Sequence, residues 1–252
     1  MIRTAWVAMV AVAATLVCAP LVILVSLFGS HSPLIDRIVK YWARSIVLSA
    51  GMKISIDGTR GIDWSRRYIL IANHHSYMDI PTLLSTIPQP VRFMAKKSLF
   101  QIPLFGWGLS AAGFIPIDRK DRSKASTSFG MASERIRKGN TIVIFPEGGR
   151  SREYRMKEFK RGAFLLAMKS NLPILPVALV GTYEVMPATR LKIVPGPVVV
   201  RLAPPIDTAE LSVREIDGLI ASTKNLIEEM RKEGSGIGER GSENGEQESA
   251  NG

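Results

Sequence analysis

The apolar residues divide the chain into three parts. No charged residue occurs from Thr4 to Gly29, a run long enough for a helix that crosses a bilayer. From Leu34 to Met52, apolar residues recur at helical spacing opposite a charged face, which is typical of a helix that lies at a membrane surface. Residues 1–52 are therefore predicted to form a membrane-anchoring helical segment.

Two alternatives to a straight membrane span stay open for the first run. Arg3 before an apolar core is also found in cleaved signal peptides, although this run exceeds the usual apolar region of about 7–15 residues and lacks a small-residue cleavage site. Pro20 divides the run, which suits a re-entrant or hairpin insertion equally well. Because basic residues flank both sides, the charges do not determine the orientation.

Between residues 53 and 232, short apolar runs alternate with helical patterns. This alternation predicts an α/β fold with a central, mostly parallel sheet flanked by helices. The predicted strands are Lys53–Ile56, Tyr68–Ala72, Val91–Ala95, Phe114–Ile117, Thr141–Phe145, Ile174–Val180 and the pair Leu191–Val194 and Val198–Leu202. The predicted helices are Pro81–Ser85, Pro103–Ala112, Ser123–Arg137, Arg161–Ser170 and Ser212–Lys232. Residues 233–252 contain almost nothing to bury and are predicted to be a disordered tail.

Charge restricts the class of partner. The net charge is +11, and the segment from Arg92 to Arg161 contains sixteen basic and six acidic residues, an excess of ten. Such a field favours nucleic acid, anionic lipid headgroups or phosphorylated metabolites, and the apolar N-terminus favours the last two. The single cysteine, Cys18, excludes an internal disulfide.

The segment Asn-His-His-Ser-Tyr-Met-Asp, residues 73–79, follows a predicted strand and so belongs to a βα loop, where open α/β sheets bind their ligands. His74 and Asp79 can meet if His74 lies in the turn and Asp79 in the first helical turn, which the nearby Pro81 favours. A carboxylate on one ring nitrogen raises the basicity of the other, so this pair could take a proton from a hydroxyl.

Two other interpretations apply to the same segment. Ser76 and Asp79 have the spacing of a capping box, which would explain both without any chemistry. A zinc site would need His74, His75 and Asp79, but adjacent histidines on a tight turn rarely converge on one ion, and residues 53–252 offer no other histidine and no cysteine. No metal site is therefore predicted.

Two further strand ends and one helix start provide candidate anion ligands. After the strand that ends near Phe145, Gly148 permits a sharp turn, Arg150 offers a planar fork to a phosphate, and Glu147 suits an acceptor hydroxyl or the orientation of Arg150. Arg119 follows the strand in Gly-Phe-Ile-Pro-Ile-Asp-Arg, residues 113–119. Lys160 lies at a helix start, where a cation is disfavoured unless an anion joins it. The alternative for each is a solvated surface loop.

The segment 95–113 combines an apolar and aromatic cluster with two lysines. Core packing would account for many of these side chains, and the cluster is also expected where an acyl chain or a bilayer meets a basic loop. Its apolar members are Phe100, Ile102, Leu104, Phe105 and Trp107.

Four segments in order resemble the conserved blocks of the glycerolipid acyltransferases. They are residues 73–79, 113–119, 145–151 (Phe-Pro-Glu-Gly-Gly-Arg-Ser) and 172–178 (Leu-Pro-Ile-Leu-Pro-Val-Ala). Residues 95–119 are particularly similar to the bacterial 1-acyl-sn-glycerol-3-phosphate (lysophosphatidate) acyltransferases. The chain departs from the family pattern at Gly149, where threonine is common, and His75 occupies a variable position.

The resemblance implies an enzyme that transfers an acyl chain from acyl-CoA or acyl-carrier protein to lysophosphatidate, giving phosphatidate in phospholipid biosynthesis. It implies no metal and no organic cofactor, and it places an acyltransferase domain in residues 53–232. By position, His74 is the general base and Asp79 its orienting partner. The implied glycerol phosphate ligands are Arg119, Glu147, Gly148 and Arg150, to which the helix-start argument adds Lys160.

The expected location is the inner, cytoplasmic membrane, with the catalytic domain on the cytoplasmic face where thioester donors are made. Membrane lipids are expected partners and nucleic acid is not. Rival functions are acylation of glycerol 3-phosphate, a lyso-ornithine lipid or another lysophospholipid, and a non-catalytic phosphatidate-binding protein. A lipid hydrolase is disfavoured because the Gly-x-Ser-x-Gly motif is missing from the sequence.

Overall fold

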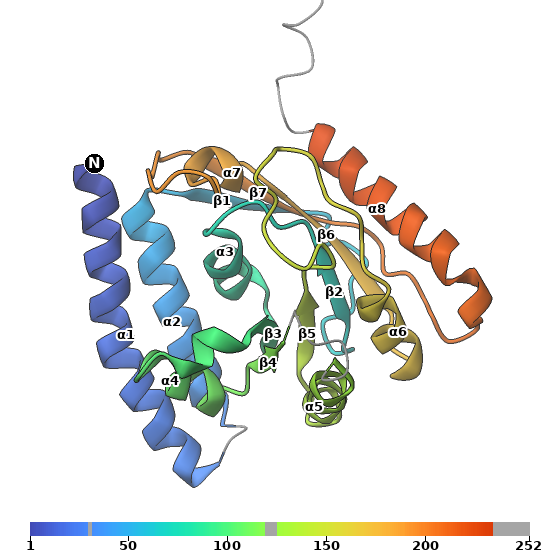
Figure 1. The fold of residues 1–252 in the computed structure, drawn as a ribbon, viewed down its shortest axis with the longest axis horizontal. Helices are drawn as coiled ribbons and strands as arrows, with labels where there is room; N and C mark the ends of the chain where they lie inside the picture. Colours follow the sequence, from blue (N-terminus) through green and yellow to red (C-terminus); the bar gives the residue numbers. More distant parts are fainter. Residues whose placement is uncertain (30–31, 119–124, 234–252) are drawn as a thin grey trace, which may run out of the picture.

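The computed structural model describes residues 1–29, 32–118 and 125–233. The described residues form a seven-stranded sheet in the order β1-β7-β6-β2-β5-β3-β4, with helices on both faces (Figure 1). The strands are β1 (Lys53–Asp57), β2 (Ile69–Ala72), β3 (Val91–Lys96), β4 (Ile115–Ile117), β5 (Thr141–Ile144), β6 (Ile174–Val180) and β7 (Pro197–Leu202). The β6–β7 pairing is antiparallel and the other pairings are parallel, which confirms the predicted fold class.

The central strands are buried on both faces, which is why they appear in the sequence as continuous apolar runs. In β2, Leu70 and Ala72 point into one core while Ile69 and Ile71 point into the other. The first core lies under α1 (Ile2–Phe28), α2 (Pro33–Ala50), α3 (Asp79–Thr86) and α4 (Phe105–Ala111). The second lies under α5 (Ala125–Arg137), α6 (Gly162–Lys169) and α8 (Ile216–Lys232).

The predicted strand Leu191–Val194 is wrong. These residues form no strand, and the backbone N–H groups of Ile193 and Val194 donate to Thr4 Oγ1 at 3.0 Å and to the Val185 carbonyl at 2.9 Å. Ile193 packs into a small core with residues of α1 and α2, so its apolar character reflects helix packing and not sheet pairing. Two short helical elements in the described residues were not predicted, η1 (Lys97–Gln101) and α7 (Thr182–Val185). The predicted helix Ser212–Lys232 begins with a short 3-10 helix, η3 (Val213–Glu215), and continues as α8.

Helices α1 and α2 lie side by side and pack against the domain (Figure 1). Helix α1 continues through Pro20 and is the one helix in the described residues that is long and apolar enough to cross a membrane. Its outer face leaves large apolar side chains exposed, among them Trp6, Met9, Val12, Leu16, Val17, Leu21 and Leu24. This exposed face is a candidate membrane contact.

Helix α2 differs from the expected surface helix. Most of its apolar face is buried against α1, α3 and the sheet, with Ile35 and Ala43 in the main core. Trp42 Nε1 donates to Thr15 Oγ1 of α1 at 2.9 Å, and Asp36 forms an ion pair with Arg92 of β3 at 2.7 Å. The amphipathic pattern of α2 therefore serves packing inside the protein.

Candidate active site

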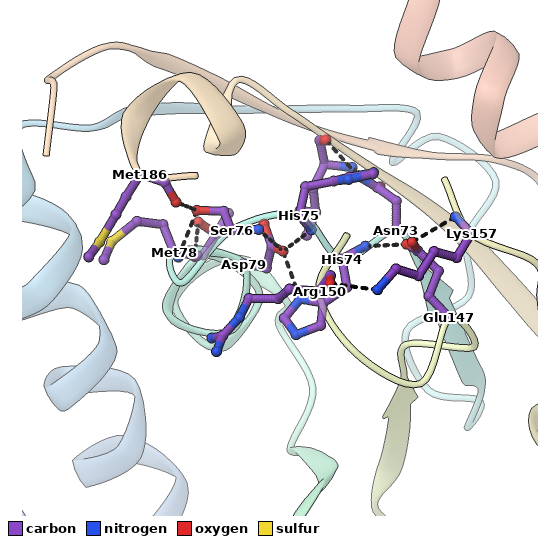
Figure 2. A network of polar contacts seen from close by, with 12 residues as sticks. Asn73, His74, His75, Ser76, Met78, Asp79, Glu147, Arg150, Lys157 and Met186 are labelled. Atoms are coloured by element: carbon purple, nitrogen blue, oxygen red, sulfur yellow. Dashed lines mark hydrogen bonds and ion pairs between the residues drawn. The ribbon is translucent and has the colours of Figure 1, made fainter. Parts of the chain in front are cut away.

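The adjacency of β2 and β5 creates the site. The two strands are parallel neighbours, with Ile71 opposite Ile144, so both chains leave the sheet at the same edge. The loop of residues 73–79 and the turn of residues 145–151 consequently lie beside each other (Figure 2). Asn73 anchors the first loop to β6, because its side-chain amide donates to the Leu179 carbonyl at 3.0 Å and its side-chain carbonyl accepts the Leu179 N–H at 2.7 Å.

His74 and Asp79 meet as the sequence predicts. The Nδ1 atom of His74 lies 2.8 Å from Oδ2 of Asp79, whose side chain is fully buried. The same oxygen accepts the backbone N–H groups of His75 and Ser76, each at 2.9 Å. These donors hold the carboxylate in place at the first residue of α3, where the helix dipole favours an anion.

The imidazole of His74 is positioned for proton transfer through its other nitrogen. The ring stacks on Phe145, with 3.9 Å between centroids and 13° between planes. Because Nδ1 faces a carboxylate, the favoured tautomer carries its proton there and leaves a lone pair on Nε2. Nε2 makes no hydrogen bond to any described residue. The arrangement leaves a base available to an incoming hydroxyl.

The capping-box alternative is only half formed. Asp79 accepts the Ser76 N–H, but the Ser76 hydroxyl oxygen accepts the N–H of Met78 at 3.0 Å and its proton goes to the Met186 carbonyl at 2.7 Å. Helix α3 begins after Met78, which provides no side-chain cap. The carboxylate therefore organises the whole turn around His74, and capping alone does not account for it.

Glu147 connects the two loops. Its Oε1 accepts the backbone N–H of His74 at 2.7 Å, and its Oε2 accepts the backbone N–H of Lys157 at 3.0 Å. The side chain is 4% exposed, and burial raises the pKa of its carboxyl to about 7. Two backbone N–H groups thus occupy the Glu147 carboxylate, which the sequence predicted would bind an acceptor hydroxyl or orient Arg150.

The predicted anion ligands in the described chain lie around the same turn. Gly148 has φ +73°, and a Cβ there would lie 2.6 Å from Lys160 Nζ, so the lysine passes directly over the turn. The Arg150 guanidinium stacks on Tyr77, with Cζ 3.6 Å from the ring centroid. Arg119 lies outside the described residues, although the strand before it, β4, ends at the same sheet edge as β3.

Sequence reasoning missed two contributors. Tyr77 received no role, yet it supports Arg150. Lys157 was also missed, although its backbone meets Glu147 and its Nζ donates to the Arg150 carbonyl at 2.8 Å. The position of Tyr77 within the His74 loop was a usable signal, whereas nothing in the local pattern around Lys157 distinguishes it from its basic neighbours.

An apolar cavity of about 440 Å³ opens beside the His74 loop. Its walls come from α1, α2, α3 and α4, and Tyr77 and Met78 bring it to the turn that carries His74. Phe105, from the aromatic cluster noted in the sequence, lines it. A cavity of this kind accepts a long apolar group and excludes water.

His75 faces away from this arrangement. It is 1% exposed, its ring lies 6.2 Å from that of Tyr154, and neither ring nitrogen has a hydrogen-bond partner in the described chain. Burial lowers the pKa of its imidazole to about 4. Among the described residues, no three His, Cys, Asp or Glu side chains are grouped as a metal ion would require.

The buried His75 should make the fold sensitive to acid. In the folded protein the pKa of His75 lies below its ordinary value of 6.5, so between these two values the unfolded chain binds more protons than the folded one. The folded state therefore loses stability as pH falls from about 6.5 towards 4. The raised pKa of Glu147 acts in the opposite direction over a similar range. We therefore expect the difference in unfolding free energy between wild type and His75→Phe to change by up to about 3 kcal/mol in favour of the variant between pH 7 and 4. Urea unfolding of both proteins at several pH values measures this difference in unfolding free energy. A difference that stays constant with pH would contradict the prediction.

A buried His–Asp pair lies at the carboxyl edge of a mostly parallel sheet, next to an apolar cavity and cationic side chains, an arrangement suited to proton transfer on an amphiphilic substrate. Residues 53–180 match the family model described as Acyltransferase, and the chain belongs to this family.

Named relatives and a solved structure are similar to this chain. The chloroplastic 1-acyl-sn-glycerol-3-phosphate acyltransferase BAT2 of Brassica napus is 36% identical over 194 residues, covering 75% of this chain and 56% of that protein. The 1-acyl-sn-glycerol-3-phosphate acyltransferase of Salmonella typhimurium is 35% identical over 162 residues, covering 64% of this chain and 65% of that protein. The chain thus spans about half the length of the first of these relatives.

The solved structure establishes similarity of fold. The crystal structure of the 1-acyl-sn-glycerophosphate acyltransferase PlsC from Thermotoga maritima superposes with a TM-score of 0.78 at 23% identity, covering 93% of this chain and 97% of that one.

Proposed function

We propose that this protein is a 1-acyl-sn-glycerol-3-phosphate O-acyltransferase, which transfers an acyl chain from acyl-CoA or acyl-carrier protein to lysophosphatidate and forms phosphatidate for phospholipid biosynthesis. The observation that carries the proposal is the 2.8 Å contact between His74 Nδ1 and Asp79 Oδ2, which leaves Nε2 free of described partners beside an apolar cavity. The names of the similar proteins support the choice of lysophosphatidate.

The reaction follows from the geometry of the pair. Nε2 of His74 accepts the proton of the acceptor hydroxyl while Asp79 stabilises the imidazolium that forms. The hydroxyl oxygen attacks the thioester carbonyl carbon, the C–S bond breaks, and the imidazolium returns its proton to the leaving thiolate. The backbone N–H of Gly149 in this turn is suited to the transient oxyanion, since that of Gly148 already donates to the Phe145 carbonyl at 3.1 Å. This scheme uses neither a metal nor an organic cofactor.

We assign the apolar cavity to the acyl chain. Replacing the lining residue Ala11 with phenylalanine should fill part of it and expose about two methylenes of the longest substrates, each worth about 0.8 kcal/mol. The expected result is a fall of about tenfold in kcat/KM for the longest thioesters relative to shorter ones. Val12→Phe is the matched control, because Val12 faces outward from the same helix. A parallel loss for every chain length would contradict the assignment.

We assign the glycerol phosphate to Arg150, together with Arg119, Lys160 and the Gly148 turn, whereas both carboxylate oxygens of Glu147 are occupied by backbone N–H groups. Arg150→Lys keeps the charge but loses the planar fork, so KM for lysophosphatidate should rise about tenfold while kcat changes little. The measurement is steady-state kinetics with lysophosphatidate and with an uncharged monoacylglycerol. An equal loss for both acceptors would remove Arg150 from the phosphate site.

We further propose that the protein acts at the inner, cytoplasmic membrane with its domain on the cytoplasmic face. The exposed apolar face of α1 supports contact with lipid, and the cytoplasmic side follows from where thioester donors are made. External protease added to spheroplasts of a bacterial host should leave the domain intact, and cleavage before lysis would reverse the proposed side.

The decisive experiment is a matrix of donors against acceptors with purified protein. Acyl-CoA and acyl-carrier protein are each offered with lysophosphatidate, glycerol 3-phosphate, lyso-ornithine lipid and lysophospholipids, and products are separated by thin-layer chromatography. Phosphatidate formation is the expected result. Turnover with another acceptor but not with lysophosphatidate would replace the substrate, and lipid binding with no turnover would favour a phosphatidate-binding protein.

A further inference from the structure

A second cleft, of about 610 Å³, has Arg150 in its lining. The loop of residues 150–158 forms one wall and α8 contributes to the other. Its lining is polar and rich in cations, and the contributing basic residues are Arg150, Arg152, Arg155, Lys157 and Lys224. None of the four sequence motifs includes the part of this loop beyond Ser151.

Two of these arginines are available to a ligand. Lys224 is paired with Glu158 at 2.6 Å, an ion pair that ties the loop to α8, and Lys157 Nζ is held by the Arg150 carbonyl. Arg152 and Arg155 are exposed and form no ion pair with a described residue. Their guanidinium groups can therefore bind a phosphate without breaking an existing contact.

The cleft and the apolar cavity meet at one contact. Arg150 lines the cleft, and its guanidinium lies 3.6 Å over the ring of Tyr77, which lines the apolar cavity. His74 precedes Tyr77 by three residues in the same loop. A single ligand could therefore place its apolar tail in the cavity, its reactive carbonyl near His74 and an anionic head in the cleft.

We propose that this cleft binds the phosphorylated nucleotide head of a coenzyme A thioester, with Arg152 and Arg155 on its phosphates. This inference rests on the proposed acyl transfer and selects one of its two donors. The volume falls within the range of about 300–1,000 Å³ typical of small-molecule sites. Carboxylates in the lining, such as Glu153 and Glu228, can accept hydrogen bonds from ribose hydroxyls and the adenine amino group.

Size argues against a carrier protein in this place. A stable protein interface takes about 20–30 residues on each partner, whereas ten residues line this cleft. Three of the ten are the carboxylates Glu153, Glu158 and Glu228. A compact polyphosphate can contact the two free arginines and avoid those carboxylates.

The test is the double variant Arg152→Ala/Arg155→Ala, assayed with palmitoyl-CoA and with palmitoyl-pantetheine, which lacks the nucleotide. We expect KM for palmitoyl-CoA to rise roughly ten- to hundredfold, while kcat and the KM for lysophosphatidate stay within about twofold. Kinetics with the truncated thioester should be unchanged. The matched control is Arg60→Ala/Arg214→Ala, which removes two exposed arginines outside the cleft and should change neither donor.

Each other outcome overturns the inference. An unchanged KM for palmitoyl-CoA, or an equal loss with palmitoyl-pantetheine, would remove the nucleotide from the cleft. A selective loss with palmitoyl-carrier protein would make the same arginines a protein-docking surface. If the wild type transfers acyl groups from no donor, the proposed function fails separately, and calorimetric titration with free coenzyme A still decides the inference. The double variant should bind coenzyme A at least tenfold more weakly than the wild type does. Equal binding by both proteins, or undetectable binding by both, would overturn the inference.

Discussion

His74→Ala should reduce kcat by about a thousandfold or more, because it removes the group that accepts the hydroxyl proton and later protonates the thiolate. Lipid binding should persist, since the apolar cavity and the cationic residues are untouched. The fold should also persist, because Asp79 keeps its two backbone donors, the N–H groups of His75 and Ser76. The measurement is initial rate with saturating donor and acceptor, alongside equilibrium binding of phosphatidate in vesicles.

The adjacent histidine is the matched control for this experiment. The ring of His75 is buried beside Tyr154 and has no hydrogen-bond partner in the described residues, so His75→Gln should retain activity within about tenfold at neutral pH. Retention of more than a tenth of the wild-type rate by His74→Ala would remove the general base from the mechanism. Loss of phosphatidate binding in the same variant would instead assign His74 to lipid recognition.

Asp36→Ala should destabilise the protein by about 3 kcal/mol, because it leaves a charged guanidinium buried without its partner. Arg92 is 3% exposed, and its ion pair with Asp36 joins α2 to β3. Burial lowers the pKa of Arg92 while Asp36 raises it, so the carboxylate offsets the cost of burying the charge. Urea unfolding of the detergent-solubilised protein provides the measurement.

A second variant separates loss of the pair from loss of the charge. Asp36→Ala/Arg92→Met removes both ions and fills the buried site with an apolar side chain, so it should recover most of the stability lost in Asp36→Ala. If the double variant is no more stable than the single one, the energetic role of Asp36 lies elsewhere on α2.

Most of the strands could be predicted from the sequence because they are buried on both faces of the sheet. Ile174–Val180 is buried at every position, and the continuous apolar run was enough to predict β6 with its observed bounds. The same rule failed at Leu191–Val194, where Ile193 packs with residues of α1 and α2 and no strand forms. The apolar face of α2 is packed largely inside the protein, which its periodicity alone did not reveal, because a helix that faces a protein core and one that faces a membrane have the same periodicity.

The local turn around His74 was also predictable, since the pair spans five residues and Pro81 restricts where α3 can start. Glu147 was assigned a substrate role from its motif, and its actual partners were not foreseen. Its carboxylate binds the backbone of His74, which is 73 residues away in the chain. Such a contact depends on β2 lying next to β5, and the order of strands in a sheet leaves no periodic trace in the sequence.

The sequence by itself determined the α/β class, the loops proposed to carry the chemistry and the pairing of His74 with Asp79, because local spacing and burial on each face dictate them. The tertiary structure alone decided that Glu147 supports the His74 backbone, that Tyr77 carries Arg150, and that four helices enclose an apolar cavity while the loop after β5 and α8 form a cationic cleft. Those features arise from side chains far apart in sequence, and only the packing of whole elements around the sheet brings them within contact distance.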